Sequence, residues 1–149
     1  MDAHKESTIN IHATAVLFQS KGLLIRGEPG SGKSDLALRL IDAGGQLIAD
    51  DRCVLSLNSS DKVQATAPEN LAGLLEVRGL GLISLPYVKA AEIDLTIDLV
   101  KEPKLIPRLP SDKERQNVLL GQALQKIQLW PFADSAIPVI KMALATPFP

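Results

Sequence analysis

Short apolar runs and alternating segments predict several β-strands in the first two thirds of the chain. Residues 10–18 alternate in part, and residues 23–25 form an apolar run of the length that a buried parallel strand needs. Residues 46–51, QLIADD, predict a short strand that ends in two aspartates. Residues 93–99 alternate strictly between apolar and polar side chains, so we expect a half-exposed strand with its polar positions toward solvent.

Helical patterns appear in two longer segments and one short one. Residues 33–43 carry apolar side chains at i,i+4 spacing, and the two glycines that follow predict a C-cap. Residues 133–145 predict a closing helix with Pro138 in its first turn, where proline is tolerated. Pro68 and Glu69 mark the start of a short helix.

The remaining segments predict a hairpin, a loop and further strands. Residues 53–67 read as a hairpin with its turn at residues 58–61, NSSD. Residues 101–115 combine three prolines with a high density of charge, which excludes regular helix or central strand and predicts a mobile surface loop. Residues 117–130 resume a strand-like pattern.

Helices and strands mix throughout the chain, and no internal repeat or long linker divides it. We therefore expect an α/β fold built on a mixed sheet, in one domain that spans residues 1–149. Residues 1–9 are expected to form a flexible tail ahead of the first strand.

Composition narrows the class of partner. With 46% hydrophobic and 22% charged residues and a net charge of −1, the chain is typical of a soluble globular protein. No lysine or arginine run marks a nucleic-acid footprint, and no 18-residue apolar segment marks a membrane span. The start of the chain lacks the apolar core of a secretion signal, so we expect a cytoplasmic protein. Cys53 is the single cysteine and reads as a small buried strand residue.

The segment GEPGSGKS fits the phosphate-binding pattern G-x-x-x-x-G-K-[ST], with an apolar strand before it and a helix after it. Its glycines let backbone N–H groups turn toward an anion, the lysine reaches the β- and γ-phosphates, and the serine hydroxyl reaches Mg²⁺. The helix N-terminus adds partial positive charge at the same place. The residues expected to bind the cofactor are Gly27, Gly30, Ser31, Gly32, Lys33, Ser34 and Asp35.

Phosphoryl transfer also needs carboxylates, and Asp50 and Asp51 are the best candidates. They end a strand that we expect next to the phosphate-loop strand. The glycine-rich loop and the two aspartates would then face one crevice. Adjacent strand residues face opposite ways, so one aspartate could hold Mg²⁺ through water while the other acts as base. An acidic pair after a strand is otherwise a common cap or turn.

The stretch LLEVRGLGLISL, residues 74–85, is the third candidate. Glu76 and Arg78 share one face if a strand extends that far, and Gly79 and Gly81 give a backbone that can close near a ligand. From the residues alone, a salt-bridged surface strand followed by a bend explains the pattern equally well.

The ordered set IHATAVLF, LLIRGEPGSGKSDLALRLIDAGGQLIADD and LLEVRGLGLISL resembles the catalytic domain of HPr kinase/phosphorylase, which phosphorylates a serine of the phosphocarrier HPr. The shared hallmarks are a histidine ahead of the loop, the G-x-x-G-x-G-K-S loop, an A-D-D strand end and an L-E-x-R-G-L-G segment. The resemblance is close from about Asn10 to Leu85. It implies the phosphate-loop mixed-sheet fold of that domain.

The resemblance also implies roles for individual residues. Gly30, Gly32, Lys33 and Ser34 would hold the ATP phosphates and Mg²⁺. Asp51 would take the proton of the acceptor serine, with Asp50 beside it. His12 occupies the position of the family's active-site histidine and would help to orient phosphate or acidic groups, although a strand histidine by itself is more often a packed or capped residue. Metal contacts would come from Ser34, Asp50 and Glu76, and contacts to the protein substrate or to the loop over the nucleotide from Arg78, Gly79 and Arg108.

The chain departs from the family pattern in several places. Pro29 stands where family loops carry serine, and Asp35 where they carry glutamate, but neither change removes a phosphate ligand. Longer members have an N-terminal domain that this chain is expected to lack, and PRLPSDKER only faintly echoes a later segment that serves oligomer contacts and the reverse reaction. The resemblance therefore extends to the kinase reaction and not to the phosphorylase reaction or the hexamer. Whether the chain forms a homo-oligomer stays open.

These observations predict an ATP- and Mg²⁺-dependent serine kinase that acts on an HPr-like phosphocarrier of a bacterial phosphotransferase system. Two alternatives remain. A small-molecule kinase would need a lid, for which residues 101–115 are the candidate, although Arg108 and Arg115 lie too far apart in sequence for the arginine pair of a phosphate-closing lid. A nucleotide-binding sensor without transfer activity would have no need of the Asp50-Asp51 pair.

Overall fold

A long strand, β9 (Ala91–Leu99), lies at the centre of the main sheet. The computed structural model describes residues 8–146. β9 pairs in parallel with β3 (Lys21–Arg26) on one side and with β11 (Gln122–Leu129) on the other. At Gly22 the two backbones approach so closely that a Cβ would lie 1.9 Å from the carbonyl oxygen of Glu92. Glycine at this position therefore lets β9 pack against the strand that leads into the phosphate loop.

Beyond β3 the sheet continues with β2 (Ala13–Phe18) and β4 (Gln46–Ala49). β2 is antiparallel to β3, and β4 is antiparallel to β2. β3 and β4 therefore run in the same direction, and their carboxyl ends lie at one edge of the sheet. The glycine-rich loop and the acidic pair both follow at this edge.

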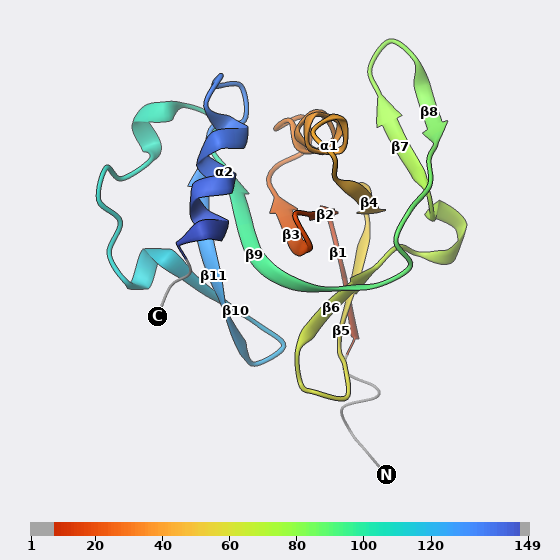
Figure 1. Ribbon diagram of the computed structural model, residues 1–149, viewed down its shortest axis with the longest axis horizontal. Coiled ribbons are helices and arrows are strands. Elements are labelled where there is room, and N and C mark those ends of the chain that lie inside the picture. The colour runs from red at the N-terminus through yellow and green to blue at the C-terminus, as the bar shows by residue number, and fades with distance from the viewer. Residues whose placement is uncertain (1–7, 147–149) are drawn as a thin grey trace.

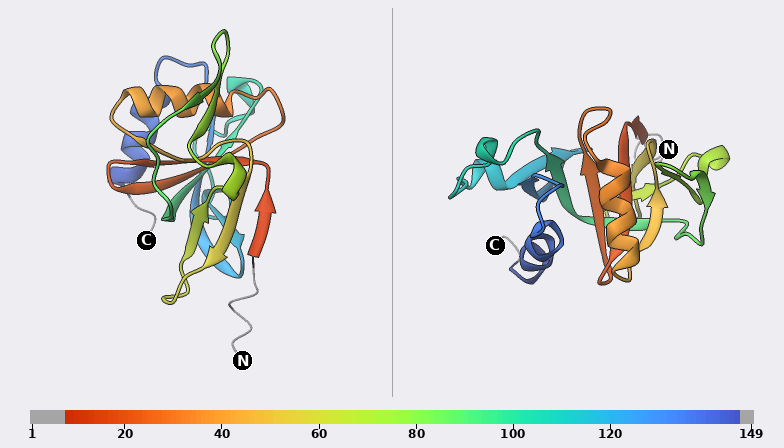
Figure 2. Two further views of the ribbon diagram at one scale, coloured as in Figure 1. Left: turned by 90° about the vertical axis from the view of Figure 1, so that its right-hand side faces the viewer. Right: turned by 90° about the horizontal axis from the view of Figure 1, so that it is seen from above.

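Smaller elements surround this sheet (Figure 1). An antiparallel group in the order β1, β5 and β6 pairs with the first residues of β9, and β10 pairs with β11. A separate hairpin, β7–β8, projects from the body of the molecule in both Figure 1 and Figure 2. The bounds are β1 (Thr8–Ile11), β5 (Cys53–Leu57), β6 (Val63–Thr66), β7 (Leu74–Val77), β8 (Gly81–Ser84), β10 (Gln116–Leu119), α1 (Lys33–Asp42), α2 (Ala136–Ala145), and 3₁₀ turns at Glu69–Leu71, Pro103–Leu105 and Lys113–Arg115.

Two apolar clusters hold these layers together. One joins the sheet to α1, α2 and β7, and it includes the fully buried Leu36 and Leu40 of α1 and Ile140 of α2. The other joins the opposite side chains of β2, β3 and β4 to the β5–β6 hairpin, with Leu24 and Leu55 fully buried. Apolar burial on both faces explains why β3 reads as a continuous apolar run and not as an alternating one.

Most of the predicted architecture is confirmed. The fold is a single-domain α/β structure with a mixed sheet, both helices and the 58–61 turn lie where expected, and Pro138 lies in the first turn of α2. The expected short helix is a 3₁₀ turn. Residues 101–115 contain two 3₁₀ turns and no α-helix or strand. Neither α-helix of the described chain is long and apolar enough to cross a bilayer.

Three expectations need correction. The first predicted strand is two strands, since the chain bends at His12 between β1 and β2. The polar face of β9 is exposed only in part: Asp94 is exposed and Asp98 is partly exposed, as predicted, but Thr96 between them is fully buried. Thr8 and Ile9, expected in a flexible tail, begin β1, and residues 1–7 of that predicted tail lie outside the described residues.

Cys53 is fully buried in β5, as its sequence context predicts. Burial raises the pKa of its thiol from 9.0 to about 12, partly offset by a hydrogen bond with the backbone of Thr66.

We expect a thiol reagent at pH 8 to leave Cys53 of the native protein unlabelled and to label Cys53 at once in denaturant. Above pH 9 the unfolded chain ionises this thiol and the native state does not, so stability should fall with rising pH. Labelling of the native protein at the rate of a free thiol would contradict this account.

Candidate active site

The phosphate loop follows β3 and ends at the first residue of α1, as the motif predicts. Gly30 and Gly32 have φ values of 78° and 104°, a region that favours glycine. A Cβ on Gly32 would also lie 3.1 Å from the rings of Pro131 and Phe132. The loop therefore turns in a small space, against a segment that comes from the far end of the chain.

Lys33 is buried, with only 8% of its surface exposed. Its Nζ donates hydrogen bonds to the carbonyl oxygens of Gly27 at 2.8 Å and Glu28 at 3.1 Å. The ammonium group is thus held across the loop that would receive phosphate. In the same loop, Ser31 Oγ is buried and has no hydrogen-bond partner among the described residues. A buried hydroxyl without a hydrogen-bond partner destabilises the fold, unless an oxygen of a bound ligand accepts its hydrogen bond. The loop is therefore suited to binding an anion.

Asp50 is the most connected side chain of the site. Its Oδ1 accepts hydrogen bonds from Thr14 Oγ1 at 2.9 Å and from Ser34 Oγ at 2.8 Å. Its Oδ2 accepts one from the backbone N–H of Glu76 at 3.1 Å. Asp50 is 7% exposed, and three donors offset the cost of burying its charge. The carboxylate links β2, α1 and β7.

The acidic pair reaches the loop by a different strand order from the one expected. β4 is not next to β3, because β2 lies between them. The prediction of a shared crevice still holds, since β3 and β4 run in the same direction and end at the same edge. The intervening β2 supplies Thr14, which bridges both aspartates.

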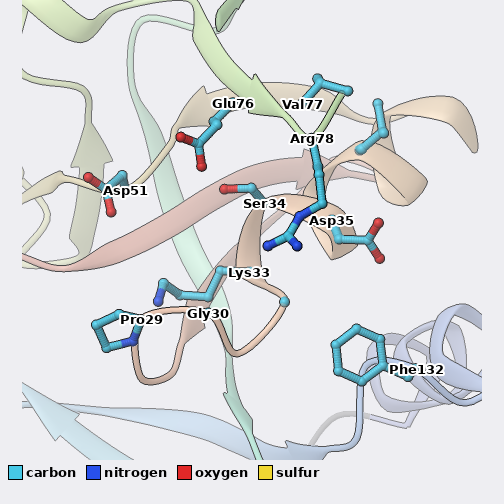
Figure 3. Close-up of a pocket in the computed structure, with 12 residues that line it drawn as sticks. Pro29, Gly30, Lys33, Ser34, Asp35, Asp51, Glu76, Val77, Arg78 and Phe132 are labelled. Atoms are coloured by element: carbon cyan, nitrogen blue, oxygen red, sulfur yellow. The ribbon is translucent and has the colours of Figure 1, made fainter. Parts of the chain in front are cut away.

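Asp51 lies in a sharp turn directly after Asp50. It has a φ of 67°, and its backbone N–H donates to Thr14 Oγ1 at 3.3 Å. The next residue, Arg52, donates its N–H to the carbonyl oxygen of Asp50 at 2.7 Å. The turn leaves Asp51 exposed, and Asp51 lies at the edge of the cavity (Figure 3). Left-handed backbone at a non-glycine residue is a strain that functional turns often carry.

One cavity of about 670 Å³ collects most of the predicted site residues (Figure 3). A smaller one of about 230 Å³ adjoins it and is shared by Ser34, Asp50, Asp51 and Glu76. The larger cavity is lined by Pro29, Gly30, Gly32, Lys33, Ser34, Asp35, Leu38, Asp51, Glu76, Val77, Arg78 and Phe132.

Some predicted residues lie elsewhere. His12 is exposed, and among the described residues it lines neither cavity, although its neighbours pair with Arg26 and Cys53 at the same sheet edge. Arg78 does line the larger cavity, but it follows the end of β7, in the turn with Gly79, and so does not share a strand face with Glu76. Arg108 lines a different cavity, beside α2.

Two functional groups were missed from the sequence. Thr14 lies within an apolar strand. The only signal in the sequence was a hydroxyl-bearing residue at a position where a buried strand usually carries an apolar side chain. Phe132 lies 98 residues after Ser34 in a segment that carries no motif, so the sequence held no signal that it would reach the loop. Both are placed by long-range strand pairing.

The donor set fits a hard divalent cation. Within residues 8–146 no three acidic, histidine or cysteine side chains form a metal cage. Mg²⁺ does not require one, because it usually binds one or two carboxylates together with waters and substrate phosphates. Ser34 Oγ and the carboxylates of Asp50, Asp51 and Glu76, which line one small cavity, supply oxygen ligands of that kind.

A glycine-rich loop between a parallel strand and a helix, with a lysine and carboxylates around one cavity, defines a phosphate-loop protein. The chain belongs to the family described as HPr Serine kinase C-terminal domain, whose profile matches residues 4–140.

Individual relatives agree with this assignment. The HPr kinase/phosphorylase of Bordetella pertussis is 33% identical over 142 residues, covering 89% of this chain and 46% of that protein. The protein of the same name from Thermoanaerobacter sp. is 37% identical over 103 residues, covering 67% of this chain and 34% of that protein. The chain thus spans between a third and a half of these relatives. The solved Hpr(Ser) kinase/phosphatase from Coxiella burnetii matches with a TM-score of 0.77 and 30% identity over 92% of this chain and 88% of that one.

We expect Thr14→Val to lower the free energy of unfolding by about 1–3 kcal/mol, because it removes a buried hydrogen bond to a charged acceptor. Thr14→Ser, which keeps the hydroxyl, should cost less. The matched control is Thr96→Val on β9, where an equally buried Oγ1 has no partner, so that change should be neutral or stabilising. Urea unfolding measures all three, and equal losses for Thr14→Val and Thr96→Val would contradict the role of Thr14.

Proposed function

We propose that this protein is an ATP- and Mg²⁺-dependent serine kinase that phosphorylates an HPr-like phosphocarrier in the bacterial cytoplasm. The observation that carries the proposal is the convergence of the loop residues Lys33 and Ser34 with the open carboxylate of Asp51 on one cavity. Membership of the HPr serine kinase family supports the choice of acceptor. The relatives named HPr kinase/phosphorylase support it further.

The two aspartates differ in their availability, and we assign their roles accordingly. Asp50 accepts three hydrogen bonds and is nearly buried, so its oxygens are committed to positioning Ser34 and the strand of Glu76. Asp51 is exposed at the cavity and is the carboxylate free to accept a proton. Asp51 is therefore the general base for the acceptor serine hydroxyl.

In the proposed reaction, the hydroxyl oxygen of the acceptor serine forms a bond to the γ-phosphorus of ATP as the bond to the β,γ-bridging oxygen breaks. Asp51 takes the hydroxyl proton, and ADP leaves with the bridging oxygen. Lys33 and the loop N–H groups stabilise negative charge on the transferred group. Mg²⁺, when bound, neutralises charge on the β- and γ-phosphates, and Ser34, Glu76 and Asp50 through water are the residues that would hold it.

A small-molecule kinase gains no support from the predicted lid. Among residues 101–115, none lines the cavity that holds Lys33 and Asp51, while Lys101 and Leu105 line a second cavity on the other side of the loop. Arg78, in the exposed β7–β8 turn, lines the active cavity instead. Such an open site suits the side chain of a protein acceptor.

Lys33→Ala should abolish phosphoryl transfer, with a fall of at least about a hundredfold, because it removes the cation that meets the transferred charge. ATP affinity, measured by calorimetry, should fall with it. Lys62→Ala, which removes an exposed lysine of the β5–β6 turn, is the control and should match the wild type. Wild-type transfer by Lys33→Ala would overturn the assignment of the loop.

Asp51→Asn should lower transfer by about 10²–10⁴-fold and leave ATP affinity close to that of the wild type, because only the base is lost. Asp61→Asn is a matched control, since Asp61 is also exposed and has a positive φ, of 58°, in a turn outside the cavity. Loss of Mg-ATP binding in Asp51→Asn would instead identify Asp51 as a metal ligand.

A further inference from the structure

The active cavity has more room than a phosphate chain and a serine side chain account for. Its polar side chains are those of Lys33, Ser34, Asp35, Asp51, Glu76 and Arg78. Beyond these groups the cavity continues past Asp35 to the ring of Phe132, which lies at the opposite end from Asp51 in Figure 3. The end that faces away from Asp51 and Glu76 therefore carries an aromatic ring together with the carboxylate of Asp35.

Neighbouring residues fix the position of Phe132, although much of its side chain is exposed to solvent. Its ring packs edge-to-face on Trp130, with centroids 6.0 Å apart and an interplanar angle of 78°. The guanidinium of Arg39 on α1 donates a hydrogen bond to the carbonyl oxygen of Pro131, which fixes this segment to the helix that begins at the loop. The ring edge also meets the backbone of Gly32. Despite these contacts, Phe132 is 56% exposed.

A fixed and exposed aromatic ring beside a phosphate loop is a stacking surface. Nucleobases stack on aromatic side chains, and this stacking tolerates every base because each presents a π-face. The phosphates of a nucleotide held at Lys33 and Ser34 leave its nucleoside end to extend along the cavity. In the proposed reaction, the acceptor serine and the metal occupy the end of the cavity near Asp51 and Glu76. The nucleoside is then left with the end at which Phe132 lies.

We propose that the base of the nucleoside triphosphate stacks on Phe132, on the face that lines the cavity of Lys33 and Ser34. This inference rests on the proposed function, because it takes the nucleotide as the phosphoryl donor. Phe132 also lines the second cavity, of about 630 Å³, on the other side of the loop. That cavity contains neither Lys33 nor Ser34, so it does not suit a nucleotide whose phosphates are anchored at those two residues.

The test compares Mg-ATP with Mg-tripolyphosphate, which has the phosphate chain and no base. Affinities of the full chain are measured by calorimetry, and the fluorescence of Trp130, the single tryptophan, reports binding near Phe132. We expect Phe132→Ala to weaken ATP about tenfold and to leave tripolyphosphate unchanged. Phe132→Tyr, which keeps the ring, should bind ATP like the wild type.

Leu105→Ala is the matched control, because Leu105 is 54% exposed and lines only the second cavity. It should change neither affinity. The inference is overturned if Phe132→Ala binds ATP like the wild type, if it weakens both ligands equally, or if Leu105→Ala selectively weakens ATP. Failure of the wild type to bind either ligand would instead overturn the proposed function itself, whereas tripolyphosphate binding that is lost in Lys33→Ala keeps the loop assignment intact.

Discussion

Three hydrogen bonds to the carboxylate of Asp50 hold the active site together. They come from a strand, from the first turn of a helix and from a hairpin, and no two of these donors are neighbours in sequence. A buried carboxylate is stable only when such donors compensate for the water it has lost. The same requirement fixes the position of Ser34 relative to β7, and it lets the chain turn at Asp51 in a strained conformation.

This arrangement supports the different tasks that we propose for the two adjacent aspartates. Asp50 accepts hydrogen bonds from three neighbours and is almost fully buried. Asp51 is exposed and lines the cavity. Thr14 connects them, since one hydroxyl donates to the side chain of Asp50 and accepts from the backbone of Asp51. Thr14 is fully buried within β2, and this burial keeps both contacts away from competing water.

Local sequence was sufficient for the parts of the site that lie on continuous segments. The glycine loop, the lysine, the following helix and the acidic strand end could all be predicted because each depends on the chemistry of a few consecutive residues. The strand order could not, since β2 separates β3 from β4 only through long-range pairing. For the same reason Phe132 could not be predicted as a neighbour of the loop. Arg108, which the resemblance linked to substrate or loop contacts, lines a separate cavity.

The central claim is that the γ-phosphate of ATP goes to a serine of an HPr-like carrier. The most direct measurement incubates the protein with Mg-ATP and the HPr-like carrier of the same organism and locates the phosphate by mass spectrometry. The account predicts phosphoserine on the carrier. An unmodified carrier, or phosphate found only on histidine, despite measurable ATP binding would contradict it and would favour a nucleotide sensor or a different acceptor.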